Sequence, residues 1–136
     1  MSLQANAEEI QMQQFRDAME SRDLDALLAL FTDEVAFHSP VAHAPHQGRA
    51  QVETLLRAVD QVVEDLRYTR QIGAPDAADS ALVFKARVGD HEVEGCDFIH
   101  VNEDGLIDEL HVMFRPLSGL MALAEAMKRQ LAPAAS

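Results

Sequence analysis

The 136-residue chain has little of several chemically informative residue types. It contains one cysteine, one tyrosine, no tryptophan and 11 basic residues against 23 acidic ones. A lone cysteine, Cys96, excludes an internal disulfide and a multi-cysteine zinc site, and it is compatible with a reducing cytoplasm. The formal net charge of −12 argues against nucleic acid or an anionic membrane as partner, because both require clustered Lys and Arg.

Long apolar runs are also missing. No stretch approaches the roughly 20 residues that cross a bilayer, and we predict no membrane association. The N-terminus, MSLQANAEEI, has neither a basic leader nor an apolar core, so we expect no signal peptide and a cytoplasmic protein. Residues 1–3 could come from an expression vector. The length predicts one domain over residues 4–131, followed by a disordered tail over 132–136.

Helical periodicity dominates the first half of the chain. The first apolar stripe consists of Ile10, Met12, Phe15 and Met19. Asp23 is a candidate N-cap for a short second helix, LDALLALF, and EVAFHSP is typical of a short strand that Pro40 ends. Gly48 precedes a third, amphipathic helix. Its apolar stripe is Val52, Leu55, Leu56, Val59 and Val63.

After Asp65 the apolar period changes from helical to alternating. The segments 66–73, 80–88, 91–101 and 106–114 are predicted strands, and the short turns between the later ones favour antiparallel hairpins. Pro116 suits the first position of a closing helix. The residues expected to face inward from it are Leu117, Leu120, Met121, Ala124 and Leu131. The order of elements predicts an α+β fold, with helices on one face of a curved antiparallel sheet.

Three segments carry a resemblance to a known family. FRDAMESRDLDALLALFTDEVAFHSP, HQGRAQVETLL and GCDFIHVNEDGLIDELHVMF resemble the opening helices, third helix and final hairpin of the nuclear-transport-factor-2-like superfamily. This superfamily includes ketosteroid isomerase and polyketide cyclases, and the match spans roughly residues 8–115. The resemblance implies a cone-shaped, curved antiparallel or mixed sheet packed against three N-terminal helices, with an extra C-terminal helix here. It also implies an apolar pocket and a homodimer formed through the outer sheet face.

Ketosteroid isomerase has three catalytic residues, and this chain has the matching residue type at one of the three corresponding positions. The resemblance places the catalytic base immediately before the first-strand proline, where this chain has Ser39. The phenolic donor on the first helix corresponds to Phe15. The second donor, a carboxylic acid kept neutral by apolar surroundings, corresponds to Asp97. The resemblance therefore argues against steroid isomerisation.

Asp97 is the strongest catalytic candidate from the residues themselves. Strand alternation places it on one face with Val93, Gly95, Ile99 and Val101. A lone carboxylate among apolar neighbours must be paired, hydrogen-bonded or protonated, and such groups are often functional. The alternative is a structural aspartate bonded to a helix end or an arginine. Ser39 is a weaker candidate, either a hydrogen-bonding group in the pocket or an ordinary turn residue.

The remaining pocket candidates are apolar or amphipathic side chains. The predicted lining is Phe15, Met19, Phe37, Tyr68, Arg70, Ile99, Leu110 and Val112. Tyr68 and Arg70 would share one strand face, either presenting a phenol and a guanidinium to a ligand or simply forming an amphipathic surface. On the opposite face from Asp97 we expect His100, His111 and Met113, which suit a dimer interface.

The segment FHSPVAHAPHQGR concentrates three histidines around two prolines. The spacing of His38, His43 and His46 matches no usual metal-ligand pattern, and alternation turns His38 outward. We interpret the segment as a corner, with His43 and His46 either solvated in the loop or at the pocket rim as an acid or base, and predict neither a metal nor a cofactor.

Three functions remain open from the sequence. The chain could be an isomerase-, dehydratase- or cyclase-like enzyme that uses Asp97 on an apolar organic substrate. It could instead bind a small apolar ligand without catalysis, or act as a protein-interaction module through its outer sheet face.

Overall fold

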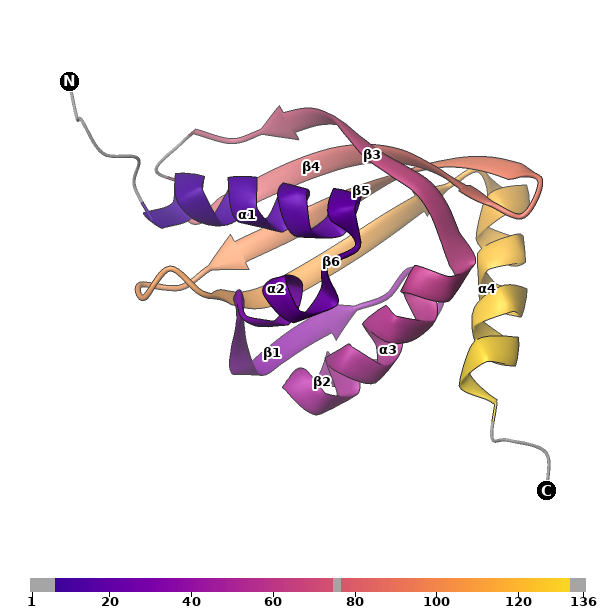
Figure 1. Cartoon of the computed structure of the whole chain (residues 1–136), viewed down its shortest axis with the longest axis horizontal. Coiled ribbons are helices and arrows are strands. Elements are labelled where there is room, and N and C mark those ends of the chain that lie inside the picture. The colour runs from indigo at the N-terminus through magenta and orange to yellow at the C-terminus, as the bar shows by residue number, and fades with distance from the viewer. Residues whose placement is uncertain (1–6, 75–76, 133–136) are drawn as a thin grey trace.

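A curved six-stranded sheet wraps around a layer of helices, as the computed structural model shows (Figure 1). The structure describes residues 7–74 and 77–132, so the predictions for residues 1–3 and 133–136 lie outside it. The helices are α1 (Ala7–Ser21), α2 (Leu24–Leu28), α3 (Arg49–Val62) and α4 (Leu117–Leu131). The strands are β1 (Phe31–His38), β2 (His46–Gln47), β3 (Val63–Ile72), β4 (Asp79–Val88), β5 (His91–Val101) and β6 (Ile107–Arg115). The α+β prediction is confirmed.

The sheet is mixed, with strand order β2-β1-β6-β5-β4-β3. Every neighbouring pair is antiparallel except β1 and β6, which run parallel with Phe37 opposite Leu110. This parallel pair joins the N-terminal strand to the C-terminal hairpin and so closes the two halves of the chain into one sheet. None of the described helices is long and apolar enough to span a bilayer.

The two predicted helix starts are confirmed. Asp23 caps α2, and its Oδ1 accepts a hydrogen bond from the backbone N–H of Ala26 at 3.1 Å. Gly48 precedes α3 with a φ of 90°, a conformation that glycine adopts without the penalty a side chain would bring. The buried face of α3 is Val52, Leu55, Leu56, Ala58 and Val62.

The helix α4 packs with a different face from the predicted one. Leu117 and Met121 are exposed, whereas Gly119, Leu123 and Met127 are buried. The physical reason is close approach, because a Cβ on Gly119 would collide with the side chain of Val93 on β5. Because α4 contacts β5 through Gly119, the residues four and eight positions later, Leu123 and Met127, also face inward. The apolar residues Leu117 and Met121 are left on the exposed side.

Strand β3 does not keep the regular alternation assumed from the sequence. Its register against β4 shifts between Tyr68 and Arg70, which pair with Phe84 and Val83 respectively. Phe84 points inward and Val83 outward, so the bulge places Tyr68 in the core and Arg70 on the exposed face. The prediction that Tyr68 and Arg70 share one face is wrong for this reason.

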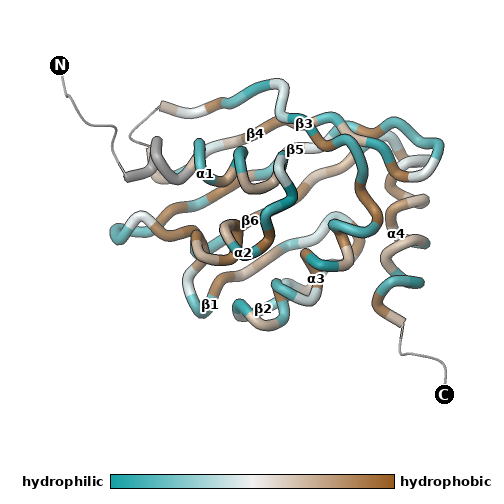
Figure 2. The backbone as a smooth tube through the Cα atoms, viewed as in Figure 1, coloured by the Kyte–Doolittle hydropathy of each residue, from teal (hydrophilic) through white to brown (hydrophobic). Residues whose placement is uncertain are grey.

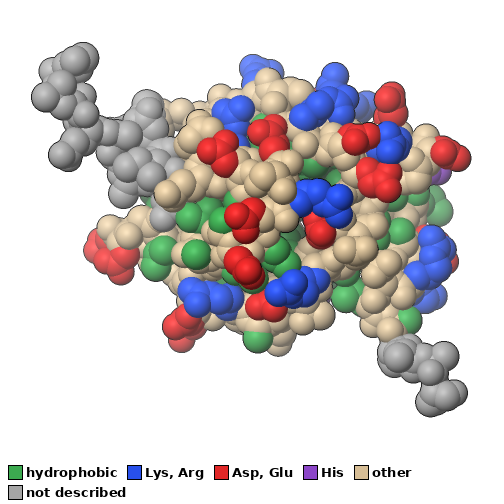
Figure 3. Space-filling model, in the orientation of Figure 1, with side chains coloured by type: hydrophobic (Ala, Val, Ile, Leu, Met, Phe, Trp, Pro, Cys, Tyr) green, Lys and Arg blue, Asp and Glu red, His purple; other side chains and the backbone are tan. Residues whose placement is uncertain are grey.

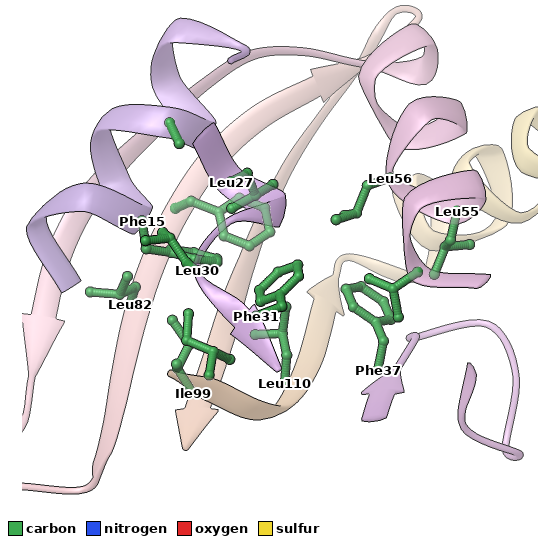
Figure 4. Close-up of a cluster of buried hydrophobic side chains, with 14 of the residues drawn as sticks. Phe15, Leu27, Leu30, Phe31, Phe37, Leu55, Leu56, Leu82, Ile99 and Leu110 are labelled. Carbon is green, nitrogen blue, oxygen red and sulfur yellow. The ribbon is translucent and has the colours of Figure 1, made fainter. Parts of the chain in front are cut away.

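The core lies between the helix layer and the concave face of the sheet (Figure 4). Its largest side chains with almost no exposure are Phe15, Phe31, Leu82, Ile99 and Ile107. Burial of each of these side chains stabilises the folded state by about 1.5–3 kcal/mol, because apolar surface is removed from water.

Hydrophobic and hydrophilic segments mix along the strands in Figure 2, and acidic and basic side chains are interspersed over the helix-bearing face in Figure 3.

Gly95 offers a direct test of the packing between β4, β5 and β6. It pairs with Phe84, whose ring fills the space a side chain would need, and a Cβ would also lie 2.6 Å from the Met113 carbonyl oxygen. We expect Gly95→Ala to lower the free energy of unfolding by about 3 kcal/mol, the upper range for an overpacked site. Urea denaturation measures it. Gly89→Ala is the control, because open space surrounds Gly89 and only backbone strain of about 1 kcal/mol is expected. Equal losses in both variants would contradict this account.

Candidate active site: an apolar cavity with one buried acid

A cavity of about 70 Å³ lies between the helices and the concave face of the sheet. Residues from α1, α2, α3 and α4, from β1, β3, β4, β5 and β6, and from the segment after β1 line it. They are Phe15, Met19, Leu27, Phe31, Phe37, Ser39, Pro40, Val41, Leu55, Leu56, Val59, Val63, Leu66, Phe84, Asp97, Leu110, Val112, Phe114, Leu123 and Met127. Ser39 and Asp97 are the only polar side chains in this lining. Val41 is 42% exposed, so the cavity approaches solvent just after β1.

Asp97 is the buried acid of this cavity. It is 4% exposed, and Val93, Gly95, Ile99 and Val101 are buried on the same face of β5, as the predicted alternation requires. Tyr68 from β3 donates a hydrogen bond from its hydroxyl to Asp97 Oδ2 at 2.7 Å. Among residues 7–74 and 77–132, no other hydrogen bond reaches the carboxyl group. Tyr68 therefore holds one carboxyl oxygen of Asp97, and the other oxygen has no hydrogen-bond partner in this part of the chain.

Burial controls the acidity of this pair. Removal from water raises the pKa of Asp97 from its ordinary value of 3.8 to about 7, although the hydrogen bond from Tyr68 opposes the rise. The pKa of Tyr68 is raised well above 10, first by burial and then by the charge of Asp97. Tyr68 consequently stays protonated and donates, while Asp97 is divided about equally between acid and carboxylate at pH 7. A group in that state exchanges protons readily at neutral pH.

Ser39 supplies the second polar atom. It follows directly after β1, at the position before Pro40, and its side chain lines the cavity. Its Oγ is buried and has no hydrogen-bond partner among the described residues. A buried hydroxyl without a partner costs roughly 1–3 kcal/mol of desolvation free energy. A ligand oxygen in the cavity would remove that cost.

The structure brings most of the predicted lining together. Phe15, Met19, Phe37, Leu110 and Val112 all line the cavity. Tyr68 does not line the cavity itself. Its hydroxyl group is hydrogen-bonded to Asp97, which does line it.

Two predicted lining residues lie elsewhere. Ile99 is buried in the core beside the cavity without lining it, and Arg70 is exposed on the other face of the sheet. The bulge in β3 is the reason that Arg70 is turned away.

The histidine-rich segment forms a corner between β1 and α3. His43 is exposed, His46 is half-buried in β2 opposite Phe37, and neither lines the cavity. Their predicted place at the rim is taken by Pro40 and Val41. His38 points away from the cavity, where its Nε2 lies 3.2 Å from Glu109 Oε2.

Several residues that line the cavity are not among those predicted from the sequence. Periodicity predicts the apolar stripe of α3, but the predicted lining does not include its members Leu55, Leu56 and Val59, which line the cavity. Leu123 and Met127 were missed because the exposed face of α4 is also apolar, so periodicity alone could not choose between the two faces. The contact between Tyr68 and Asp97 joins residues 29 positions apart and has no local signal in the sequence.

The raised pKa of Asp97 makes the stability of the fold dependent on pH. The folded state holds this proton up to about pH 7, whereas the unfolded chain loses it near pH 4, so stability falls as the pH rises between these values. Relative to an Asp97→Asn variant, we expect the wild type to lose about 1.4 kcal/mol of unfolding free energy per pH unit in this window. Urea denaturation across that range, with the exposed turn variant Asp90→Asn as control, measures the slope. A difference that stays constant with pH would overturn the assignment.

Comparison with known proteins agrees with this geometry. Residues 12–110 match the SnoaL-like domain. A steroid delta-isomerase from Pseudomonas aeruginosa is 40% identical, with a TM-score of 0.86 over 96% of this chain and 95% of that one. A protein with a cystatin-like fold from Silicibacter pomeroyi is 30% identical, with a TM-score of 0.85 over 92% of this chain and 87% of that one.

A third solved structure shares the fold alone. An NTF2-like protein of unknown function from Cytophaga hutchinsonii is 16% identical, with a TM-score of 0.64 over 85% of this chain and 96% of that one. No curated protein sequence matches the chain. The predicted resemblance is confirmed, and the chain belongs to the SnoaL-like domain family of the nuclear-transport-factor-2-like superfamily.

Proposed function

We propose that the protein is a small-molecule enzyme of the isomerase type, which moves a proton within an apolar ketone. The observation that carries this proposal is the buried carboxyl group of Asp97, whose pKa of about 7 suits both taking up and releasing a proton at neutral pH. Burial in an apolar lining is the cause of that pKa, so the cavity and the chemistry depend on the same feature.

The proposed step uses two side chains. The substrate is a ketone with a carbon–carbon double bond between its β and γ carbons. The Asp97 carboxylate takes a proton from the α carbon, which gives a dienolate, and the resulting acid returns that proton to the γ carbon while the double bond moves to the α and β carbons. While Asp97 holds the proton, the carbonyl oxygen of the substrate carries negative charge. The Ser39 hydroxyl donates a hydrogen bond to this oxygen. Tyr68 holds Asp97 through its hydrogen bond and is a positioning residue. No atom is gained or lost, so the product is an isomer of the substrate.

The size of the cavity limits the substrate. Its volume of about 70 Å³ is roughly half of the ~150 Å³ of an engineered protein cavity that binds benzene. A six-membered ring therefore requires some of the lining to move, and the flexible side chains of Met19 and Met127 are suited to this. The proposed substrate is a compact, uncharged ketone much smaller than a steroid.

The relation to the Pseudomonas aeruginosa protein supports isomerase chemistry but not the same substrate. Its name, steroid delta-isomerase, describes a double-bond shift. In this chain the position of the family's catalytic base is Ser39, and the position of the phenolic donor is Phe15. Asp97 is consequently proposed to supply the base function that the aspartate before the proline supplies in ketosteroid isomerase.

A second candidate function is ligand binding without catalysis. The observation that favours it is the unpartnered Oγ of Ser39, because a hydroxyl that waits for a ligand oxygen recognises a ligand equally well without any reaction. A small apolar molecule with one polar group would satisfy this site.

A second copy of the chain is the proposed protein partner. Phe98 and Met113 are 45% and 54% exposed on the outer face of β5 and β6, where they are neighbours of the half-buried Cys96. Pairing of two outer faces would cover these side chains. Cys96 is a free thiol whose pKa is raised by partial burial, and the cytoplasm is the proposed location of a protein that keeps it reduced.

The isomerisation of cyclohex-3-enone to conjugated cyclohex-2-enone tests the proposal. The reaction is followed by the ultraviolet absorption of the product. We expect Asp97→Asn to lower kcat/KM by about 10²–10⁴-fold, the usual contribution of a positioned acid or base. In the wild type, kcat/KM should rise with pH and level off above about 7, because only the ionised carboxyl takes up the proton.

Two variants sharpen this test. Ser39→Ala should lower kcat/KM by about 10²-fold, the lower range for loss of an oxyanion donor, without lowering stability, because Oγ has no partner among the described residues. Asp90→Asn, on an exposed turn, should behave as wild type. Binding of the ketone that depends on Ser39 without any turnover would favour the non-catalytic function. Neither binding nor turnover of this ketone, or turnover that survives Asp97→Asn, would overturn the isomerase proposal.

A further inference from the structure

Two histidines and a glutamate come together on the outer face of the sheet. His38 ends β1, and His111 on β6 is its direct partner in the parallel pairing. Their imidazole rings stack with centroids 3.8 Å apart and planes 2° from parallel. Glu109 lies two residues before His111, and its Oε2 is 3.2 Å from His38 Nε2. One potential ligand atom from each of the three residues lies within 4.8 Å of the other two.

We propose that His38, Glu109 and His111 form a binding site for a divalent transition-metal ion, with zinc as the best match. Two imidazole nitrogens and one carboxylate oxygen are a usual donor set for zinc, and three protein ligands leave a fourth position for water. Magnesium and calcium prefer oxygen ligands, so two imidazoles select against them. The site is separate from the cavity, because none of its three residues lines that cavity.

Side-chain rotations of the three residues would close the site around an ion. With metal–nitrogen distances near 2.0–2.1 Å, donor atoms around a tetrahedral ion lie about 3.3 Å apart. The lone pair of an imidazole lies in the ring plane, so the stacked rings must tilt to aim at one point. His38 and His111 are already paired in the sheet, and the exposed side chain of Glu109 already lies within hydrogen-bond distance of His38.

The surroundings provide room and negative charge for an ion. Glu109 and His111 line a hollow of about 270 Å³ on the outer face, which Asp79 and His100 also line. The carboxylates of Asp79 and Glu109 favour a cation in this hollow. His100 is already bonded to Asp108, and this hydrogen bond raises its pKa, so His100 is engaged in its own pair.

The proposed ligands come from two strands that are far apart in sequence. His38 and Glu109 are separated by 71 positions, and only the parallel pairing of β1 with β6 brings them together. His38 is also the residue before Ser39. A bound ion would therefore fix the end of the strand that presents the Ser39 hydroxyl to the cavity on the other face.

Calorimetric titration of the metal-free protein with zinc chloride tests the proposal. We expect one zinc ion per chain and no binding of magnesium at the same concentrations. His38→Ala and His111→Ala should each weaken zinc binding about a hundredfold or more, because loss of a residue that merely orients a ligand already costs about ten- to a hundredfold. Glu109→Gln should also weaken it, and this exposed, nearly isosteric change keeps the fold even if a histidine variant does not.

The histidines of the corner provide the matched control. A His43→Ala/His46→Ala double variant removes two imidazoles without touching the proposed ligands and should bind zinc as the wild type does. Zinc should also raise the thermal midpoint of the wild type and of the double variant, but much less that of Glu109→Gln. Absence of zinc binding, binding that survives His111→Ala and Glu109→Gln, or binding lost in the double variant would overturn the proposal.

Discussion

The burial of one carboxyl group is the constraint on which the cavity and its chemistry depend. Asp97 lies among apolar side chains, and a single hydrogen bond from Tyr68 offsets only part of the free energy of removing its charge from water. The result is an acid that ionises near neutral pH. Any change that lets water into the cavity, or fills it with a larger side chain, alters the pKa of Asp97 and with it the proposed reaction.

Irregularities in the sheet place the residues that act on this acid. The bulge in β3 turns Tyr68 inward against Asp97 while it sends Arg70 to the surface. The glycine at position 95 leaves room for the ring of Phe84, which lies against β5 and lines the cavity. The helix α4 closes the far wall because Gly119 allows it to approach β5 closely. Curvature, bulges and close approaches therefore build the site, and the regular strands supply its frame.

Features set by local periodicity could be predicted from the sequence, whereas features set by distant contacts could not. The helix starts at Asp23 and Gly48 and the buried alternation around Asp97 are local patterns, and the structure confirms them. The bulge after Tyr68 and the packing face of α4 depend on partners elsewhere in the chain, so spacing alone assigned them wrongly. The three-residue cluster on the outer face lay beyond sequence reasoning for the same reason, because two strands from opposite ends of the chain form it.

The titration of the Asp97 side chain is the most direct measurement of the central claim. Carbon-13 NMR of the carboxyl carbon, assigned by its loss in Asp97→Asn, reports the ionisation of this one group as the pH is changed. The account predicts a midpoint at about pH 7 and a higher midpoint in Tyr68→Phe, because the hydrogen bond that favours the carboxylate is then absent. A midpoint near the ordinary aspartate value of 3.8, unmoved by Tyr68→Phe, would contradict it.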